Sequence, residues 1–171
     1  MKTIKRRRRE NKTDYAKRLK FLKSDSPRIV FRKTNKYVLA QYITTNQSQD
    51  KIEFSVNSKD LLKFGWPKDA TSGLKSLPAS YLIGLLMGTK IIDKKQSPIL
   101  DLGMYRIIQK GKMYGFLKGL FDSGIKISYK KDVLPEESRI RGDHLKKKIP
   151  FDEIKSKIMG TRPSVAGLKK K

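Results

Sequence analysis

The side chains of this sequence that could do chemistry are mostly cations. The 171-residue chain carries 41 Lys and Arg against 16 Asp and Glu, a formal net charge of +25. A solvated surface normally mixes both signs and stays within about eight units of neutrality, so this excess favours a polyanionic partner. The densest run spans residues 6–9 and could neutralise phosphates without reading sequence, although a nuclear-localisation signal has the same composition.

A second group of cations is more specific, because a predicted β-hairpin carries it. Residues 27–33 (PRIVFRK) and 37–44 predict two strands, joined by a tight turn at 34–36. Such a hairpin would display four cations and an amide in a rigid array: Arg28, Arg32, Lys33, Asn35 and Lys36. Phe31, Tyr37 and Tyr42 are interleaved and could stack on unpaired bases. Aromatic residues in strands are more often core, so no stacking role is assigned to any of them.

Catalytic chemistry lacks most of its usual residues. The chain has no cysteine and one histidine, His144, which excludes disulfides, Cys/His zinc sites and Cys–His nucleophilic catalysis. His144 follows Asp143, but no nucleophile is arranged around the pair, so a surface or RNA contact is the better interpretation. The sequence contains neither a G-x-x-x-x-G-K-[ST] loop nor a G-x-G-x-x-G loop after a strand. We expect no enzyme, no cofactor and no metal ion.

A metal-dependent nuclease is the enzymatic alternative. Three antiparallel strands followed by helix, strand and helix is the order of ribonuclease H-type enzymes, which bind two divalent ions through clustered carboxylates. Those enzymes carry an aspartate in the first strand, whereas residues 27–33 contain no acid. Asp93, Asp101 and Asp122 lie on later elements, where helix capping or ion pairing is the expected role.

The predicted elements form a single α/β domain. A helix capped by Thr13 runs to about Lys23, with Tyr15, Leu19 and Leu22 on an apolar stripe. After the hairpin we expect a strand over 51–58, a short helix over 59–64, an irregular loop over 66–77, a helix over 78–93, a strand over 98–103, a helix over 112–123 with Phe121 inward, a strand over 125–128, and helices from 135 and over 151–159. This order predicts a mixed sheet, three antiparallel strands followed by βα units, covered by helices. The spacing of Gly84 and Gly88 predicts close packing of a helix on that sheet.

Charge divides the chain into a body and two basic ends. The net charge is +12 over residues 1–36, +5 over 37–125 and +8 over 126–171. We expect a basic N-terminal arm over 1–12, an α/β RNA-binding core over 13–128 and a basic C-terminal extension over 129–171. The longest apolar run, at 82–88, is far shorter than the ~20 residues that span a bilayer, and no signal peptide is apparent. We therefore expect an intracellular protein with no membrane partner and no small-molecule substrate.

Six blocks of sequence resemble a known family. In chain order they are RIVFRKTNKYVLAQYI (28–43), FGW (64–66) with the later loop glycine, PASYLIGLLMG (78–88), PILDLG (98–103), FLKGLFDSG (116–124) and VLPEESRIRGDHL (133–145). Together they resemble the archaeal ribosomal proteins of the eighteenth large-subunit family, whose eukaryotic counterpart is called large-subunit protein five. The resemblance covers residues 13–145, most of the chain.

The resemblance implies a non-catalytic protein of the cytoplasmic ribosome that binds 5S ribosomal RNA. It would help to attach that RNA to the large-subunit ribosomal RNA in the central protuberance, beside neighbouring large-subunit proteins. Carried over by position, the principal RNA-facing residues would be Arg6, Arg7, Arg8, Arg9, Lys12, Tyr15, Arg18, Arg28, Arg32, Lys33, Asn35 and Lys36. Secondary contacts would come from Gly73, Lys75, Tyr81, Arg139, Arg141, Gly142 and His144. The alternative from another class is an architectural protein that compacts DNA.

Overall fold

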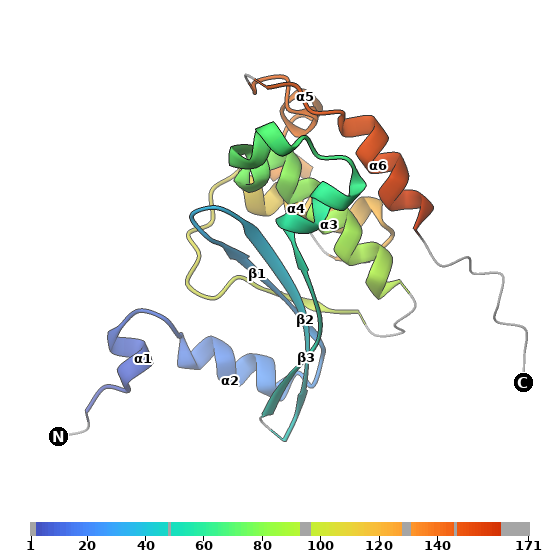
Figure 1. Ribbon diagram of the computed structural model, residues 1–171. Helices are drawn as coiled ribbons and strands as arrows, with labels where there is room; N and C mark the ends of the chain where they lie inside the picture. Colours follow the sequence, from blue (N-terminus) through green and yellow to red (C-terminus); the bar gives the residue numbers. More distant parts are fainter. Residues whose placement is uncertain (1–2, 48, 93–96, 128–130, 146, 162–171) are drawn as a thin grey trace, which may run out of the picture.

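A mixed four-stranded sheet lies at the centre of the computed structural model, which describes residues 3–47, 49–92, 97–127, 131–145 and 147–161 (Figure 1). The strands are β1 (Arg28–Lys33), β2 (Val38–Asn46), β3 (Gln49–Asn57) and β4 (Ile99–Asp101). Their order is β3-β2-β1-β4, with β1 antiparallel to β2 and parallel to β4. This arrangement confirms the predicted α/β class and mixed sheet.

The two faces of the sheet differ in chemistry. Ile29 and Phe31 of β1 are fully buried, and they pair with Tyr42 and Ala40 of β2, which are also buried. These side chains make the inner face, which packs on the helices. The alternate residues of β1, among them Arg32, lie on the outer face, because successive side chains of a strand point to opposite sides. The outer face therefore carries the arginines of β1, and Arg32 is the one that lies toward the hairpin tip.

Helix α3 (Leu77–Ile91) is apolar on almost every side, and such a helix must be buried all round. It packs between the sheet and α4 (Lys112–Asp122). A Cβ at Gly84 would collide with the Phe116 carbonyl oxygen of α4, so the helices approach closely here. The prediction that Gly84 and Gly88 pack on the sheet is thus wrong, since both face α4.

The sequence predicts that Phe121 of α4 points inward, but its side chain is 47% exposed, so that prediction is wrong.

Two 3-10 helices, η1 (Ser58–Phe64) and η2 (Lys68–Lys75), follow β3 in the chain and precede α3, which both of them contact. Asn57 caps η1 and forms a capping box with Asp60. The irregular loop predicted over 66–77 is instead ordered by Trp66, which is buried and donates its indole N–H to the Ala70 carbonyl oxygen at 3.0 Å. A buried indole needs such an acceptor, and this one shapes η2.

The C-terminal helices share the same core. They are η3 (Lys131–Val133), α5 (Glu137–Arg141) and α6 (Phe151–Gly160), and α5 and α6 contact α3. Phe151, Ile154 and Ile158 are buried with the core residues of α3, and the Phe151 ring lies 5.5 Å from that of Tyr81. The hydrophobic core thus continues past residue 128. Residues 125–127 form no strand, and 128 lies outside the described residues, as do 162–171 and Asp93.

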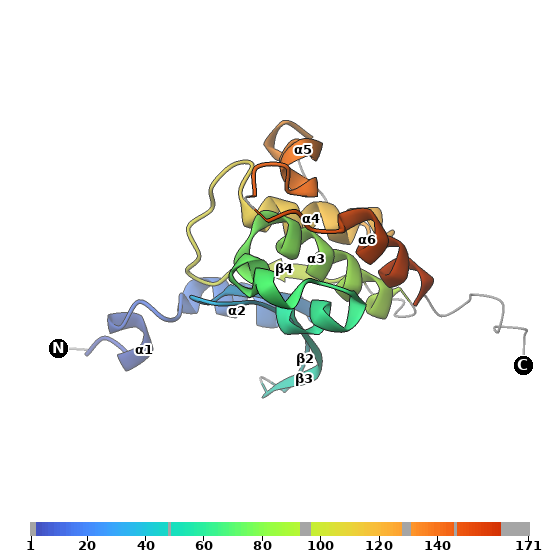
Figure 2. The ribbon, with the colours of Figure 1, turned by 45° about the horizontal axis from the view of Figure 1, so that its top comes forward.

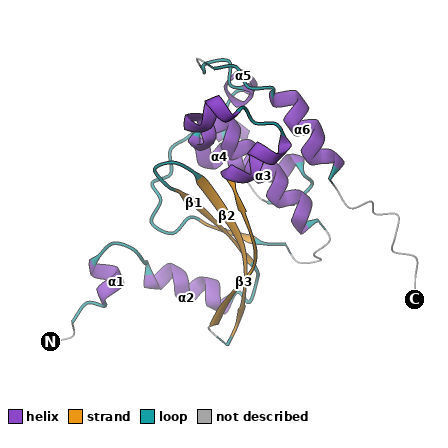
Figure 3. Ribbon diagram, viewed as in Figure 1, coloured by secondary structure: helices purple, strands orange, loops and turns teal. Residues whose placement is uncertain are grey.

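The N-terminal helices α1 (Arg6–Arg9) and α2 (Tyr15–Lys23) contain no fully buried residue. Figure 2 shows α2 on the side of the sheet away from α3 and α4, and Figure 3 shows the other helices gathered at the opposite end of the strands. Asp14, not Thr13, caps α2 by accepting hydrogen bonds from the backbone N–H groups of Ala16 and Lys17. The predicted apolar stripe is only partly buried, because Leu19 is 54% exposed while Tyr15 and Leu22 are half-buried. Throughout the described ranges, every helix is too short or too polar to cross a lipid bilayer.

Candidate nucleic-acid interface

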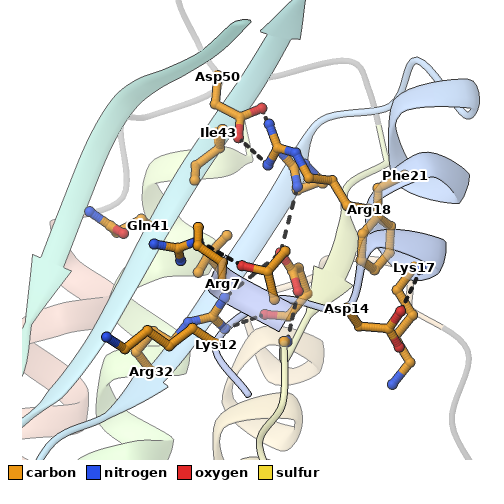
Figure 4. A pocket seen from close by; sticks show the side chains of 15 residues that line it. Arg7, Lys12, Asp14, Lys17, Arg18, Phe21, Arg32, Gln41, Ile43 and Asp50 are labelled. Atoms are coloured by element: carbon orange, nitrogen blue, oxygen red, sulfur yellow. Dashed lines mark hydrogen bonds and ion pairs between the residues drawn. The ribbon is translucent and has the colours of Figure 1, made fainter. Parts of the chain in front are cut away.

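A cleft of about 240 Å³ lies between the N-terminal helices and the outer face of the sheet (Figure 4). We call it the basic cleft. Its cations come from the arm, from α2 and from β1, and they are Arg7, Lys12, Lys17, Arg18, Arg28 and Arg32. Three acids also line it: Asp14, Asp50 and Asp101. Segments distant in the sequence meet here, so the fold gathers these cations at one place on the surface.

Asp50 joins α2 to the sheet. One of its carboxylate oxygens lies 2.6 Å from Nη2 of Arg28, and the other lies 2.9 Å from Nη1 of Arg18 (Figure 4). Thr45 supports this contact by donating its hydroxyl to Asp50 at 3.1 Å. The Phe21 ring of α2 lies 5.8 Å from the Arg28 guanidinium carbon. One acid from the start of β3 therefore fixes the guanidinium groups of both α2 and β1.

Arg28 is an internal ion-pair partner. Its side chain is only 3% exposed and lies between two carboxylates, Asp50 and Asp101, the latter at 3.6 Å. The expectation that Arg28 projects toward RNA is therefore wrong. The alternation of β1 correctly places this side chain on the outer face, but α2 and Asp50 cover that end of the face.

Asp101 fixes Arg32 in a more exposed position. Nη2 of Arg32 lies 3.9 Å from the Asp101 carboxylate, and Nη1 donates to the main-chain oxygens of Phe31 at 2.8 Å and Asp101 at 3.2 Å. Asp101 also accepts a hydrogen bond from the Gly103 N–H at 2.8 Å. These contacts confirm the ion-pairing role expected of Asp101, which caps no described helix. The Arg32 side chain remains 42% exposed, so it can still meet a ligand.

The charge of Asp50 is stabilised by its surroundings. Partial burial raises the pKa of this carboxyl group, but hydrogen bonds and charge interactions with Arg18 and Arg28 lower it by more. The net result is a pKa below the ordinary value of 3.8. Asp50 is thus an anion at neutral pH, which is the state that holds both guanidinium groups.

The hairpin tip presents cations without acidic partners among the described contacts. Lys33, Asn35 and Lys36 are exposed, as predicted, and the turn is closed by the Tyr37 N–H donating to the Thr34 hydroxyl at 2.9 Å. The aromatic residues of the strands belong to the core. Phe31 contacts Phe116 at 5.0 Å between ring centroids, and Tyr42 stacks on Phe54 at 5.2 Å. This confirms that neither ring is available for base stacking.

The arm brings further cations to the cleft. Residues Arg6–Arg9 are all exposed on α1, and Arg7 donates from Nε to the Thr13 hydroxyl at 2.8 Å. Tyr15 lies under the Lys5 ammonium group at 4.6 Å from its ring centroid. Lys12 pairs with Glu10 at 2.7 Å in an exposed contact. Of these residues, Arg7 and Lys12 line the cleft itself.

The residues expected to make secondary contacts fall into two places. Gly73, Lys75, Arg139 and His144 line a pocket beside the start of α3. Arg141 lines a different, smaller depression together with Tyr81.

Tyr81 does not fit the role of an RNA contact. It is 1% exposed, and its hydroxyl donates to the Asp122 carboxylate at 2.7 Å. Burial and Asp122 raise the pKa of this phenol. The expectation for Tyr81 is therefore wrong, because its hydroxyl joins α3 to α4.

Sequence reasoning missed several residues of these sites. Lys17 lines the basic cleft, and Lys110 and Lys112 line the pocket beside α3, but none of them is among the expected RNA contacts. Asp50 is not among the predicted site residues either, although an acid beside strands in so basic a chain is a signal for an ion pair. Among the described residues, no group of three His, Cys, Asp or Glu side chains could hold a metal ion.

Known proteins similar to this chain are ribosomal. The family described as "Ribosomal large subunit proteins 60S L5, and 50S L18" matches residues 1–98. The large ribosomal subunit protein uL18 of Korarchaeum cryptofilum is 43% identical over 143 residues, covering 82% of this chain and 70% of the relative. Those of Methanoregula boonei and Halobacterium salinarum are 40% and 41% identical, each covering 82% of this chain and respectively 79% and 75% of the relative. The chain therefore belongs to the uL18 family of large ribosomal subunit proteins.

Proposed function

We propose that this chain binds 5S ribosomal RNA and helps to attach it to the large-subunit ribosomal RNA in the central protuberance. Membership of the uL18 family supports a structural role for the chain in the large ribosomal subunit. The observation that carries the proposal is the basic cleft, where Arg18 and Arg32 are held in fixed positions next to an exposed basic hairpin.

Preorganisation explains why a folded RNA suits this surface. Ordering a long side chain on binding costs about 0.5–1.5 kcal/mol, and this cost is smaller for a side chain that is already held. Double-stranded RNA is recognised mainly through its shape and its phosphates, because its major groove is too deep and narrow for side chains to read. A fixed array of guanidinium and ammonium groups therefore selects a phosphate arrangement, and phosphate neutralisation provides most of the affinity.

The proposed RNA-facing residues are those that the structure leaves accessible. The arm and α2 contribute Arg6, Arg7, Arg8, Arg9, Lys12, Tyr15 and Arg18, and the hairpin contributes Arg32, Lys33, Asn35 and Lys36. Arg28 and Tyr81 are excluded because their side chains are buried and paired within the protein.

A competition experiment tests the proposal. Labelled 5S ribosomal RNA is bound to the full chain at about 0.15 M salt, the physiological ionic strength, and is challenged with duplex DNA or with an unrelated folded RNA. We expect the complex to survive both competitors, and nuclease footprinting to protect a single region of the 5S RNA. Equal competition by duplex DNA would support the DNA-compacting alternative. Equal competition by the unrelated RNA would leave only general polyanion binding.

A further inference from the structure

A second pocket lies where α3 and α4 begin, on the helical side of the sheet. We call it the α3 pocket, and its volume is about 410 Å³. Its cationic and titratable lining residues are Lys75, Lys110, Lys112, Arg139 and His144, and none of its described lining residues is acidic. The basic cleft contains three acids among its cations, so the two sites differ in the balance of their charges.

Three elements deliver these residues. Lys75 ends η2 directly before α3, and Lys112 is the first residue of α4. Gly142 ends α5 in a left-handed conformation, with φ at +91°, which favours glycine. A Cβ at Gly142 would also come within 3.0 Å of Cγ of Pro78, so this turn lies against the start of α3 and carries Arg139 and His144 to the pocket.

The lysines of the pocket repel one another. Burial, followed by the charges of Lys33 and Lys75, lowers the pKa of Lys112. Lys33 belongs to the exposed hairpin and does not line the pocket, but its charge still acts on Lys112. Lys110 pairs with Glu136 at 3.5 Å, but both side chains are more than half exposed, and the pair does not neutralise the interior. An anion in the pocket would relieve this repulsion.

Hydrogen-bonding capacity is also unused here. Ser76 lines the pocket at the N-cap of α3, and among the described residues its buried hydroxyl oxygen has no hydrogen-bond partner. Within the same part of the chain, no side chain caps α3 or α4, whose N-caps are Ser76 and Gly111. The first backbone N–H groups of both helices therefore have no side-chain acceptor, apart from Pro78, which has no N–H. Helix N-termini carry partial positive charge and offer these N–H groups to anions.

We propose that the α3 pocket binds a backbone phosphate of RNA, held by Lys75, Lys112 and Arg139. The inference deepens the proposed RNA-binding function and rests on it for the identity of the ligand. Crowded lysines, a buried hydroxyl without a partner and two uncapped helix ends all favour the same kind of group, a compact anion with several acceptor oxygens.

The pocket is tested first without RNA, with inorganic phosphate as the probe. The melting temperature of the full chain is measured in phosphate and in chloride at equal ionic strength. The variant is Lys75→Gln with Lys112→Gln, and the control is Lys63→Gln with Lys126→Gln, which removes the same charge from exposed positions. We expect phosphate to raise the melting temperature of the wild type and the control more than that of the variant. An equal increment in all three proteins would overturn the pocket.

Binding of 5S ribosomal RNA provides the second test. One phosphate contact contributes about one unit to the slope of log affinity against log salt, which corresponds to about fivefold in affinity near 0.15 M. We expect the pocket variant to lose this amount relative to the control. If the wild type prefers 5S RNA but the variant matches the control, the pocket inference alone fails. If the wild type shows no preference, the proposed function fails, and the phosphate measurement still decides whether the pocket binds an anion.

Discussion

Replacing Asp50 by Asn separates positioning from charge, because the two effects change RNA affinity in opposite directions. Asn keeps the size of the side chain but removes the anion that lies 2.6 Å from Arg28 and 2.9 Å from Arg18. If only net charge mattered, a chain with one acid fewer would bind RNA more tightly. The Coulomb energy between unit charges 10 Å apart in water is about 0.4 kcal/mol, so the gain would be roughly twofold.

Positioning predicts the opposite result. Arg28 is 3% exposed and retains Asp101 at 3.6 Å, so its charge is only partly uncompensated in the variant. Complete loss of a buried partner costs about 3–5 kcal/mol, and we expect about 2 kcal/mol here because one carboxylate and one amide oxygen remain. A domain stable by about 5–15 kcal/mol still folds after that loss. Helix α2, which has no fully buried residue, then loses its ion pair to the sheet.

The expected decrease in affinity follows from the freedom that α2 and Arg18 gain. Ordering the released Arg18 side chain again on binding costs about 0.5–1.5 kcal/mol, which weakens binding roughly twofold to tenfold. The assay is fluorescence anisotropy with labelled 5S ribosomal RNA at about 0.15 M salt. Glu153→Gln is the matched control, since it removes one negative charge from the exposed surface of α6. Affinity of the Asp50→Asn variant equal to or above that of the control would refute the positioning role.

Three further predictions concern the hairpin, the α3–α4 contact and acid stability. Replacing Arg32, Lys33 and Lys36 together by Ala should lower the salt slope of 5S RNA binding by about 2–3 units, and an unchanged slope would show that the hairpin faces elsewhere. Tyr81→Phe should lower the free energy of unfolding by about 0.5–1.5 kcal/mol in a urea titration while RNA affinity changes less than twofold, whereas a large loss of affinity would reinstate Tyr81 as an RNA contact. Because the folded-state pKa of Asp50 lies below 3.8, its contribution to stability is complete above that pH and is lost as the pH falls through the lowered value. Urea titrations at successive pH values should therefore show a weaker acid dependence for Asp50→Asn than for the wild type, and parallel curves would contradict the ion pairs.

Local patterns in the sequence predict the sheet well, because its information is local. The turn at 34–36 indicates the hairpin, but it would pair Lys33 with Tyr37, whereas Lys33 pairs with Val38 because the turn also includes Tyr37. The apolar block around 98–103 indicates the strand β4, although its parallel pairing with β1 is not visible in the sequence. A close approach to the backbone of α3 is visible in Gly84, although the sequence suggests the sheet and not a second helix as the neighbour. Which helix it meets is not visible, because that depends on where α4 lies in the folded chain. The order of the segment after Trp66 is not visible in the sequence either, because that segment has few ordering signals of its own. It is ordered by the hydrogen bond from Trp66 to Ala70.

The site is predicted less well, because its decisive contacts are not local. Arg28 has the residue type and the strand position of a phosphate ligand, and its alternation is correct. Asp50, 22 residues away, makes it a structural cation instead. Lys112 illustrates the converse error, since a lysine at the start of an amphipathic helix looks like ordinary solvated surface until Lys33 and Lys75 are found beside it.

The few acids of this chain explain how a large positive charge becomes selective. A flexible cationic chain gains counterion entropy on any polyanion, and its affinity then carries little information about the partner's shape. Asp50 and Asp101 reduce the number of free cations in the basic cleft but fix the positions of those that remain, Arg18 and Arg32. The α3 pocket has the opposite balance, since its lysines have no acid between them and an external anion must complete it. A surface with both kinds of site meets one arrangement of phosphates with little reorganisation, while other arrangements must break internal ion pairs or leave the pocket unfilled.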